Sequence, residues 1–354
     1  MKVALLGMMQ SGKTSLLGAV SGKEFPQGPT MAMAEETINV PDSRIDWLTN
    51  HYKPKRTIYS TLECQDYPGF YFTDEAGRAA ARKQLAEARL AGMLVLVIRA
   101  FDDPTVPAYR GSVNPERDLA EFKEELLLAD LELITTRIER LEKAVQKHSK
   151  NIDKDRAELA LQKKLEATIE DGNPLNTIEL NGEERDILRS LNFLTMKPIM
   201  VVVNVGEDNL DTSFQFDLDD SVPVVPLCCS LEQELAQLDA EDRVDFMNDL
   251  GLTEKASDRF VANCYSALGL ISFLTSGTDE VRAWPIPRDA SALEAAGKIH
   301  SDIQRGFIRA ETIAFDDLVE LGDEKAVKAA GKARLEGKTY VVKDGDIIEF
   351  RFNV

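Results

Sequence analysis

The sequence predicts an α/β fold with a mostly parallel β-sheet. Short apolar runs rich in β-branched residues recur along the chain, and they start at Val3, Ile58, Met93, Ile199 and Val222. Runs of roughly four to six apolar residues between turn residues are typical of strands that are buried on both faces of a sheet. The stretches between them have helical spacing, as the crossover connections of parallel strands require. We therefore expect a layered α/β domain.

The first apolar run leads into a phosphate-binding pattern. The residues from Gly7 to Thr14 read GMMQSGKT and fit GxxxxGK[ST], and a helical run from Ser15 to Val20 follows them. In this pattern backbone N–H groups curl around phosphate, the Lys13 ammonium reaches the terminal phosphates, and the Thr14 hydroxyl binds Mg²⁺. A chance glycine turn is the alternative. The expected substrate is ATP or GTP, and the expected cofactor is Mg²⁺. The predicted phosphate site consists of Gly7, Met9, Gln10, Ser11, Gly12, Lys13, Thr14 and Ser15.

A second acidic pattern follows the run that ends at Cys64. The residues from Asp66 to Gly69 read DYPG and have the spacing DxxG, which also occurs in ordinary turns. At the end of a strand beside the P-loop, Asp66 would hold Mg²⁺ through water, and the Gly69 N–H would sense the γ-phosphate. Thr30 lies in the loop after the first helix, where phosphate-switch proteins often place a threonine on Mg²⁺. We expect a metal site of Thr14, Thr30 and Asp66, and Gly69 joins the phosphate site.

The run from Ile199 to Val203 is followed by the predicted base-reading segment. Asn204-Val205-Gly206-Glu207 stands where a guanine-specific protein has NKxD, whose Asp accepts hydrogen bonds from guanine. The Lys is absent and the longer Glu207 cannot simply make the same bonds, which argues against specificity for GTP. A second segment, from Leu227 to Leu231, corresponds to the loop beside the nucleobase, although buried thiols are equally ordinary at the end of a core strand. The predicted base site is Asn204, Val205, Glu207, Cys229, Ser230 and Leu231.

A long charged insertion with helical spacing extends from about Pro115 to Lys197. One predicted helix carries an apolar seam that steps by alternate fours and threes, at Leu127, Leu131, Ile134, Ile138, Leu141 and Val145. The segment from Ile152 to Ile169 is the predicted returning helix, with an apolar face at Leu161, Leu165 and Ile169. The pair would form an antiparallel arm. An ordinary amphipathic helix packed on the domain is the alternative.

The C-terminal part of the chain has the size of a small α+β module. It extends from about Thr278 to Val354 and ends in the strand-like YVVKDGDIIEFRFNV, in which Asp344-Gly345 is a turn signal and Ile347, Phe350 and Phe352 can supply a core face. We therefore expect a nucleotide-binding domain at 1–114 and 198–277, an arm at 115–197, and a C-terminal domain at 278–354.

Composition excludes some classes of function. With 354 residues and 44% hydrophobic content, the chain can bury a core of roughly two or three domains. A net charge of −19 argues against non-specific coating of DNA or of an anionic membrane. The cysteines lack metal-ligand spacing and are expected as reduced thiols. The N-terminal apolar run is too short for a signal peptide, and none approaches the ~20 residues of a membrane span. We expect a cytoplasmic monomer.

The chain resembles the YchF/Obg-like ATPase family, a branch of the Obg group of translation-factor-class P-loop proteins, from the P-loop to the last residue. Its most specific stretches are Val40-Pro41-Asp42 with the following SRID, Asn204-Val205 with Glu207, AAGKIHSDIQRGFIRAETIAFDDLVELG from Ala295, and the final GKARLEGKTYVVKDGDIIEFRFNV. The resemblance implies a hydrolase that often prefers ATP and associates with the ribosome. It also implies a coiled-coil arm in the insertion and a TGS domain, of the ubiquitin-like β-grasp type, at the C-terminus.

The sequence departs from the family at positions that concern catalysis. Met9, Gln10 and Ser11 replace the usual Pro, Asn and Val, so the asparagine on which a potassium site is built is absent. Phe70 follows DxxG, where many GTPases have a water-orienting glutamine, and the family shares a hydrophobic residue there. The segment after Phe70 reads as a helix instead of a mobile glycine-rich stretch, and Ala108 stands where the family has a histidine. We assign no catalytic base and expect slow turnover.

The sequence is compatible with three functions. The first is a slow ATPase or NTPase switch that contacts the translation machinery, the second is a nucleotide-binding scaffold with little turnover, and the third is a small-molecule kinase with the same P-loop. Basic clusters could meet ribosomal phosphates, although a solvated charged face by itself explains each of them, so the ribosomal partner is implied mainly by the resemblance. The clusters lie at Lys53, Lys55 and Arg56, along 143–154, and at Arg305 and Arg309.

Overall fold

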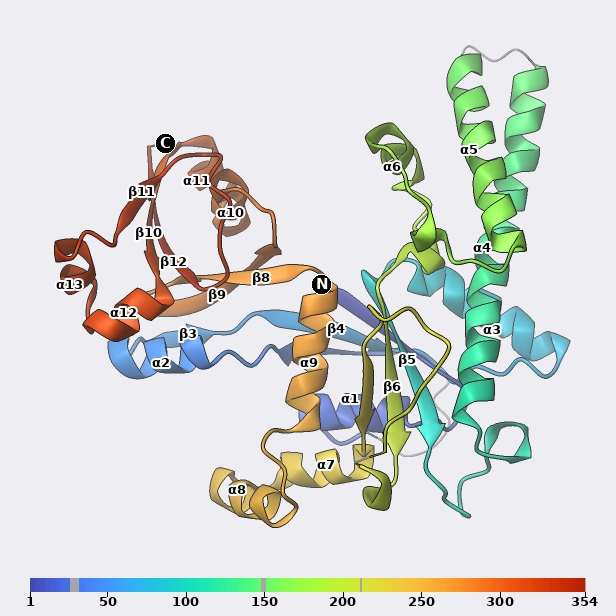
Figure 1. Cartoon of the computed structure of the whole chain (residues 1–354), viewed down its shortest axis with the longest axis horizontal. Helices are drawn as coiled ribbons and strands as arrows, with labels where there is room; N and C mark the ends of the chain where they lie inside the picture. Colours follow the sequence, from blue (N-terminus) through green and yellow to red (C-terminus); the bar gives the residue numbers. More distant parts are fainter. Residues whose placement is uncertain (26–31, 148–150, 211, 354) are drawn as a thin grey trace. The chain divides into compact units, whose positions relative to one another are not determined.

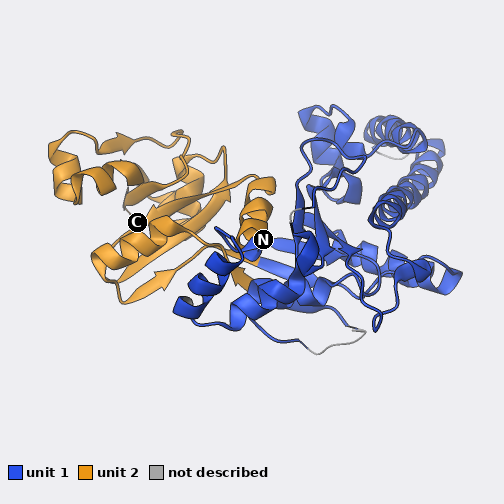
Figure 2. Cartoon of the chain, turned by 60° about the horizontal axis from the view of Figure 1, so that its bottom comes forward, with its two compact units in different colours: residues 1–36, 63–257 blue, residues 37–62, 258–354 orange. Residues whose placement is uncertain are grey.

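The computed structural model describes residues 1–25, 32–147, 151–210 and 212–353 of the chain (Figure 1). Two compact units divide it (Figure 2): unit 1 comprises Met1–Glu36 with Glu63–Ser257, and unit 2 comprises Thr37–Leu62 with Asp258–Val354. The predicted metal ligand Thr30 lies outside the described residues. The predicted domain boundaries after residues 114, 197 and 277 stay predictions, and the compact units group residues 37–62 with the C-terminal part of the chain.

Unit 1 is built on a sheet with the strand order β2-β4-β1-β5-β6-β7. The strands from β4 to β7 in this order pair in parallel, which confirms the predicted α/β fold class. The central strands are apolar and buried because layers cover both faces of the sheet. The strand bounds are β1 (Lys2–Leu6), β2 (Ala34–Asn39), β4 (Thr61–Asp66), β5 (Met93–Ala100), β6 (Ile199–Val205) and β7 (Val224–Leu227).

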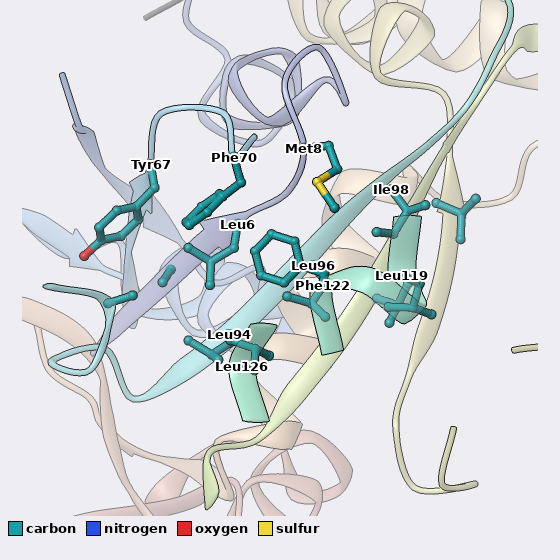
Figure 3. Packing of buried hydrophobic residues seen from close by; sticks show 14 of the residues in the cluster. Leu6, Met8, Tyr67, Phe70, Leu94, Leu96, Ile98, Leu119, Phe122 and Leu126 are labelled. Carbon is teal, nitrogen blue, oxygen red and sulfur yellow. The ribbon is translucent and has the colours of Figure 1, made fainter. Parts of the chain in front are cut away.

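Helices connect these strands and supply most of the remaining core. One of them, α1, packs against α7, and α4 packs against β5. Figure 3 shows the main apolar cluster, to which Leu6 of β1, Leu94 and Leu96 of β5, and Phe122 of α4 belong. The helices of this unit are α1 (Lys13–Ser21), α3 (Glu75–Ala88), α4 (Pro115–Gln146), α5 (Ile152–Glu170), α6 (Gly182–Leu188), α7 (Cys229–Gln237) and α8 (Ala240–Asp249).

The predicted antiparallel arm is present as α4 and α5, which lie side by side in Figure 1. Asn114 caps α4 by accepting a hydrogen bond from the Arg117 N–H, and Pro115 occupies the first turn, where its missing N–H costs nothing. Leu127, Leu131, Ile134 and Ile138 of the predicted seam join one apolar cluster with the predicted returning face, Leu161, Leu165 and Ile169. The seam residues Leu141 and Val145 are not among the members of this cluster. The first third of α4 instead packs on the core of unit 1, so both alternatives for this helix hold for different parts of it.

Unit 2 is a mixed sheet with the strand order β11-β10-β12-β8-β9-β3. Two apolar clusters form the core of this unit. One of them contains residues of α10, and the other contains residues of α2 and α12. Its strands are β3 (Arg56–Ile58), β8 (Leu270–Thr275), β9 (Glu280–Pro287), β10 (Phe307–Ala314), β11 (Arg334–Glu336) and β12 (Asp346–Phe352). Its helices are α2 (Ser43–Tyr52), α10 (Ala292–Ile299), α11 (Ser301–Arg305), α12 (Phe315–Leu321) and α13 (Glu324–Ala329), and α9 (Ala256–Ala267) begins at its boundary.

Residues 37–62 belong to unit 2 through polar contacts of the VPDSRID segment. The Asp42 side chain accepts a hydrogen bond from the Arg44 N–H and so caps α2. The Arg44 guanidinium donates to Asp42 and, at 2.9 Å, to Asp344. The same Asp344 carboxylate accepts a hydrogen bond from the Ser272 N–H at the start of β8. The most family-specific early stretch therefore has a structural role in unit 2.

Two details of the sequence interpretation are wrong. The run from Ile58 to Cys64 forms the end of β3 and most of β4, which lie in different sheets. Ile347 and Phe350 belong to different apolar clusters, since side chains alternate along a strand and residues three apart point to opposite faces. Phe352 is 45% exposed and supplies no core face.

No helix within the described ranges is long and apolar enough to cross a membrane.

Candidate nucleotide site

The P-loop connects β1 to α1 through a backbone that requires glycine at two positions, Gly7 and Gly12. Gly12 has φ 94°, and a Cβ atom there would lie 2.1 Å from the Asn204 Nδ2 atom. A Cβ atom on Gly7 would lie 2.3 Å from the Val97 carbonyl oxygen of β5. Gln10 also adopts a left-handed conformation, at φ 60°. Both pattern glycines are therefore required by close approach, and Gly12 also by its backbone angle.

Lys13 is folded back onto the loop that it follows. Its Nζ atom donates hydrogen bonds of 3.0 Å to the carbonyl oxygens of Gly7 and Met8, and the residue is only 5% exposed. Burial lowers the pKa of the Lys13 ammonium to about 8, against the opposing attraction of the Asp66 charge. A buried cation without a direct anionic partner is what a phosphate group would stabilise.

Thr14 and Asp66 come together at the start of α1 and the end of β4. The Thr14 hydroxyl donates a hydrogen bond of 2.6 Å to the Asp66 Oδ2 atom. The other oxygen, Oδ1, is buried and has no hydrogen-bond partner among the described residues. Burial raises the pKa of the Asp66 carboxyl, although the Thr14 hydroxyl and the Lys13 charge oppose this shift. A hydroxyl and a carboxylate oxygen left free are the ligand types that suit Mg²⁺.

The segment after Asp66 is bonded to the P-loop along its backbone. The Met9 N–H donates to the Phe70 carbonyl oxygen at 3.0 Å, and the Phe70 N–H donates to the Gly7 carbonyl oxygen at 3.1 Å. This parallel bridge presses Gly69 against the loop, because a Cβ atom on Gly69 would lie 2.7 Å from the Met9 Cα atom. Gly69 thus lies beside the P-loop, and the Met9 N–H is already occupied by Phe70 in this structure.

Phe70 points away from the phosphate loop into the core. The residue is 1% exposed, and its ring packs against that of Phe72. It also packs against the ring of Phe122 (Figure 3). An apolar ring in this position cannot orient a water molecule by a hydrogen bond. The side chain at the position of the usual glutamine is therefore part of the fold.

Asn204 joins the predicted base site to the phosphate loop. Its Nδ2 atom donates to the Ser11 carbonyl oxygen at 3.1 Å, and its Oδ1 atom accepts a hydrogen bond from the Cys229 N–H at 3.2 Å. The Cys229 Sγ atom lies 3.8 Å from the Gly12 carbonyl oxygen, and burial raises the pKa of this thiol well above its ordinary value. Three segments that are distant in sequence meet at this one amide.

The other predicted base-site residues differ in what they expose. Val205 and Leu231 are buried in the main apolar cluster, so their backbones rather than their side chains are available to a base. Glu207 begins the short 3₁₀ turn η4 (Glu207–Asn209) and is exposed, and Ser230 is exposed on α7. The structure thus brings the predicted segments to the carboxyl ends of neighbouring strands, where ligands of open α/β sheets bind.

Two residues near the site were not predicted. Arg99, at the end of β5, is buried and donates to the carbonyl oxygens of Phe101, Asp103, Val106 and Pro107, which fixes the loop after this strand. Gln233 of α7 donates to the Ser15 carbonyl oxygen at 3.1 Å. Arg99 could have been singled out from the sequence, because it is a lone cation at the end of an apolar strand. No local sequence pattern distinguishes Gln233.

Histidine is not part of this site in the described residues. His51 stacks on Trp47 within unit 2, and His300 caps α11 with its Nδ1 atom. Ala108 precedes the turn η1 (Tyr109–Gly111) and offers no titratable side chain. No cluster of potential metal ligands of the His/Cys/Asp/Glu type occurs in the described part of the chain, and none of the described cysteines forms a disulfide.

Comparison with known proteins identifies the family. Residues 270–353 match the family model described as "YchF-GTPase_C: Protein of unknown function (DUF933)". The "Ribosome-binding ATPase YchF" of Escherichia coli O157:H7 is 38% identical over 364 residues, with 100% of this chain and 99% of that protein covered. The "Obg-like ATPase 1" of Oryza sativa subsp. japonica is 35% identical over 372 residues, covering 100% and 92% of the two chains. The structure of the Schizosaccharomyces pombe YchF GTPase aligns with a TM-score of 0.84 at 27% identity, over 99% of this chain and 97% of that one. The chain therefore belongs to the YchF family.

Proposed function

We propose that this protein is a Mg²⁺-dependent NTP hydrolase with slow turnover that prefers ATP and associates with the ribosome. The observation that carries the proposal is the pair formed by Thr14 and Asp66, which leaves one buried carboxylate oxygen free beside the phosphate loop. Both relatives described above cover the whole chain and are named as ATPases, and the bacterial one is named as ribosome-binding. A ribosomal partner would place the protein in the cytoplasm.

The phosphate site that we propose consists of the P-loop and the residue that presses on it. Lys13 would exchange its bonds to the Gly7 and Met8 carbonyl oxygens for bonds to phosphate, and the start of α1 would add its dipole. Thr14 and Asp66 would hold Mg²⁺, which offsets the charge that develops on the phosphates. The contributing backbone is that of Gly7, Met9, Gln10, Ser11, Gly12, Ser15 and Gly69.

Preference for ATP rests on Glu207. Asn204 does not decide it: the Asn204 amide bonds Ser11 and Cys229 and so holds two loops of the site together, but it keeps a second N–H and a second lone pair for a base. Glu207 carries one methylene more than the aspartate that reads guanine, and its carboxylate cannot accept the same pair of bonds. The base would lie among the segments of Asn204, Val205 and Glu207 and of Cys229, Ser230 and Leu231.

Slow turnover follows from the burial of Phe70. Without a polar group at this position, the attacking water must be oriented by backbone, by the nucleotide or by a partner. The same observation favours the second candidate, a nucleotide-binding scaffold with little turnover. The small-molecule kinase has no support from the described relatives, which are named as NTP hydrolases.

A titration with fluorescent ATP and GTP analogues in Mg²⁺, followed by single-turnover hydrolysis, tests the proposal. Lys13→Ala serves as the control for the phosphate site. Tighter binding of the ATP analogue, lost in this variant and followed by hydrolysis, is the expected result. Tighter binding of GTP would refute the base preference, and binding without hydrolysis, also in the presence of ribosomes, would favour the scaffold. Co-sedimentation with ribosomes in each nucleotide state tests the partner.

A further inference from the structure

One helix extends from the core of unit 1 into the arm. α4 has 32 residues, which corresponds to about 48 Å at the usual rise of an α-helix. Its first turns carry Leu119, Phe122 and Leu126 into the main core, and its later turns carry Ile134 and Ile138 into the cluster shared with α5. After Pro115 the helix contains no proline or glycine, the residues that most often kink a helix. A displacement near Phe122 is therefore carried along the helix.

Phe70 connects this helix to the phosphate loop. Its ring meets that of Phe122 (Figure 3) edge to face at a centroid distance of 5.0 Å. The Phe72 ring also meets Phe122, at a centroid distance of 5.6 Å. The backbone of the same Phe70 is hydrogen-bonded on both sides to the P-loop, at Gly7 and Met9. The residue next to Gly69 is thus bonded to the nucleotide loop through its backbone and packed on α4 through its side chain.

A second set of contacts links α4 to the helix that follows Phe70. Arg82 of α3 pairs with Glu132 at 3.0 Å, and Arg78 of α3 pairs with Glu125 at 3.7 Å. Arg78 also donates to the Phe72 carbonyl oxygen at 2.9 Å, so α3 holds the segment after DxxG as well. The segment that senses phosphate and the base of the arm are therefore joined by rings and by ion pairs.

The base of the arm is itself firmly held. Asp130 of α4 is fully buried and accepts hydrogen bonds from the Leu194 N–H and from both the N–H and the hydroxyl of Thr195. The guanidinium of Arg89, just after α3, forms an ion pair with the same Asp130 carboxylate at 2.5 Å. A satisfied buried carboxylate of this kind resists local loosening, so α4 responds to a push at Phe122 by moving as a body.

We propose that Phe122 is a positioning residue that couples Gly69 to the arm formed by α4 and α5. Gly69 lies against Met9, so a shift of Gly69 on bonding a γ-phosphate would move the adjoining Phe70, and the close-packed ring of Phe122 would follow. The coupling is reciprocal, so a partner that holds the arm changes the affinity of the site for the γ-phosphate. The apolar residue after DxxG is then the connection through which the arm reports the nucleotide state. This inference rests on the proposed function, because it concerns regulation of the same site.

The test compares hydrogen exchange in the full chain with ADP and with a non-hydrolysable ATP analogue, both with Mg²⁺. In the unaltered protein, exchange in 66–72 and in α5 should differ between the two nucleotides. Phe122→Ala should abolish the difference in α5 and reduce the ratio of ATP-analogue to ADP affinity on the order of threefold to tenfold. Leu126→Ala is the matched control; it empties the same cluster on the same helix but removes no aromatic contact with Phe70, and it should preserve the difference.

Two further readouts separate the possible failures. Fluorescent-nucleotide binding is measured on the same samples: no binding in the unaltered protein refutes the proposed function, whereas binding with identical α5 exchange in both nucleotides refutes the coupling. If Phe122→Ala does not fold, Phe122→Leu is used, which keeps apolar bulk without the ring. This variant must reduce the difference in α5 hydrogen exchange between the two nucleotides at least about twofold. An unchanged difference in Phe122→Leu, or in folded Phe122→Ala, overturns the inference.

Discussion

The Thr14 hydroxyl lies 2.6 Å from the Asp66 Oδ2 atom and joins the first turn of α1 to the last residue of β4. The two residues are separated by 52 positions in the sequence. The contact engages one carboxylate oxygen of Asp66, whereas the second oxygen is buried and is bonded by no described residue. Geometry of this kind is maintained by the fold before any metal binds, because each partner sits at the end of a regular element.

Replacement of Asp66 tests whether this carboxylate serves Mg²⁺. Asp66→Asn keeps the size of the side chain but removes its charge, so hydrolysis should need on the order of tenfold more Mg²⁺ or fall by a similar factor. A Mg²⁺ titration of single-turnover hydrolysis measures the effect. Thr14→Ser retains the hydroxyl and is the matched control, with a Mg²⁺ requirement close to that of the unaltered protein. An unchanged Mg²⁺ requirement in Asp66→Asn would exclude the assignment.

Nucleotide binding should take up a proton above pH 8. Burial lowers the pKa of Lys13 to about 8 in the free protein, and bound phosphate favours the charged form and raises this pKa again. At a pH between the pKa of Lys13 in the free protein and its higher pKa in the complex, Lys13 is deprotonated in the free protein and protonated in the complex. The affinity for nucleotide therefore falls as the pH rises beyond 8. Titration calorimetry at pH 9 in buffers of different ionisation enthalpy measures the uptake, which should disappear at pH 6.5. Equal binding heats in all buffers at pH 9 would contradict the prediction.

The same group affects the stability of the free protein with the opposite trend. In the unfolded chain Lys13 has its ordinary pKa of 10.5, so the unfolded state binds more protons than the folded state between about pH 8 and 10.5. The contribution of Lys13 to the free energy of unfolding therefore rises with pH through this window. Comparison of urea unfolding in the unaltered protein and in Lys13→Met isolates it, since Met cannot titrate. A parallel pH dependence in both proteins would show that Lys13 does not contribute.

Asn204→Ala should weaken both the fold and the site. The change leaves the Ser11 carbonyl oxygen and the Cys229 N–H without their partner, and each unsatisfied buried group costs roughly 1–3 kcal/mol. Denaturant unfolding measures the loss in the free energy of unfolding, and nucleotide titration measures the loss of affinity. Glu207→Ala, at an exposed residue three positions further on, is the comparison; it should alter base preference with little effect on stability.

Gly12→Ala and Gly22→Ala separate a steric clash from backbone strain. Both glycines have positive φ, at 94° and 67°, at the two ends of α1. A Cβ atom on Gly22 meets nothing within 4 Å, whereas one on Gly12 would meet Asn204. Gly22→Ala should therefore cost only about 1 kcal/mol of stability and leave nucleotide affinity unchanged. Gly12→Ala should abolish binding; retained affinity would show that the loop can shift Asn204 aside.

The ion pair between Arg44 and Asp344 should contribute to the stability of unit 2. A double-mutant cycle with Arg44→Met and Asp344→Asn is expected to give a coupling of roughly 1 kcal/mol, because the guanidinium is mostly buried and bonds two carboxylates. The pair Lys55 and Asp279, both with side chains 80% exposed, is the control and should give a smaller coupling. Equal couplings would mean that the partly buried pair of Arg44 and Asp344 adds no more than a solvated one.

Local patterns in the sequence predicted much of the fold. The P-loop, the buried strands from Met93 and Ile199, and the returning helix from Ile152 follow from spacing and turn residues within a few positions. These elements depend on backbone angles and on the alternation of apolar side chains, which a short stretch of sequence specifies. The family and the fold class, inferred from longer stretches, are confirmed. The list of site residues stays a prediction.

Other features depend on partners that are distant in sequence. Nothing near Ile58 shows that the run divides between two sheets, and nothing near Arg44 announces Asp344, because strand pairing and ion pairing follow the path of the whole chain. The burial of Phe70 against Phe122 likewise could not be inferred from its place after DxxG. The sequence alone therefore determined the phosphate-binding chemistry, which is local to Gly7 and the residues that follow. Only the tertiary structure decided which residues hold that chemistry in place, since packing is a property of segments that meet after folding.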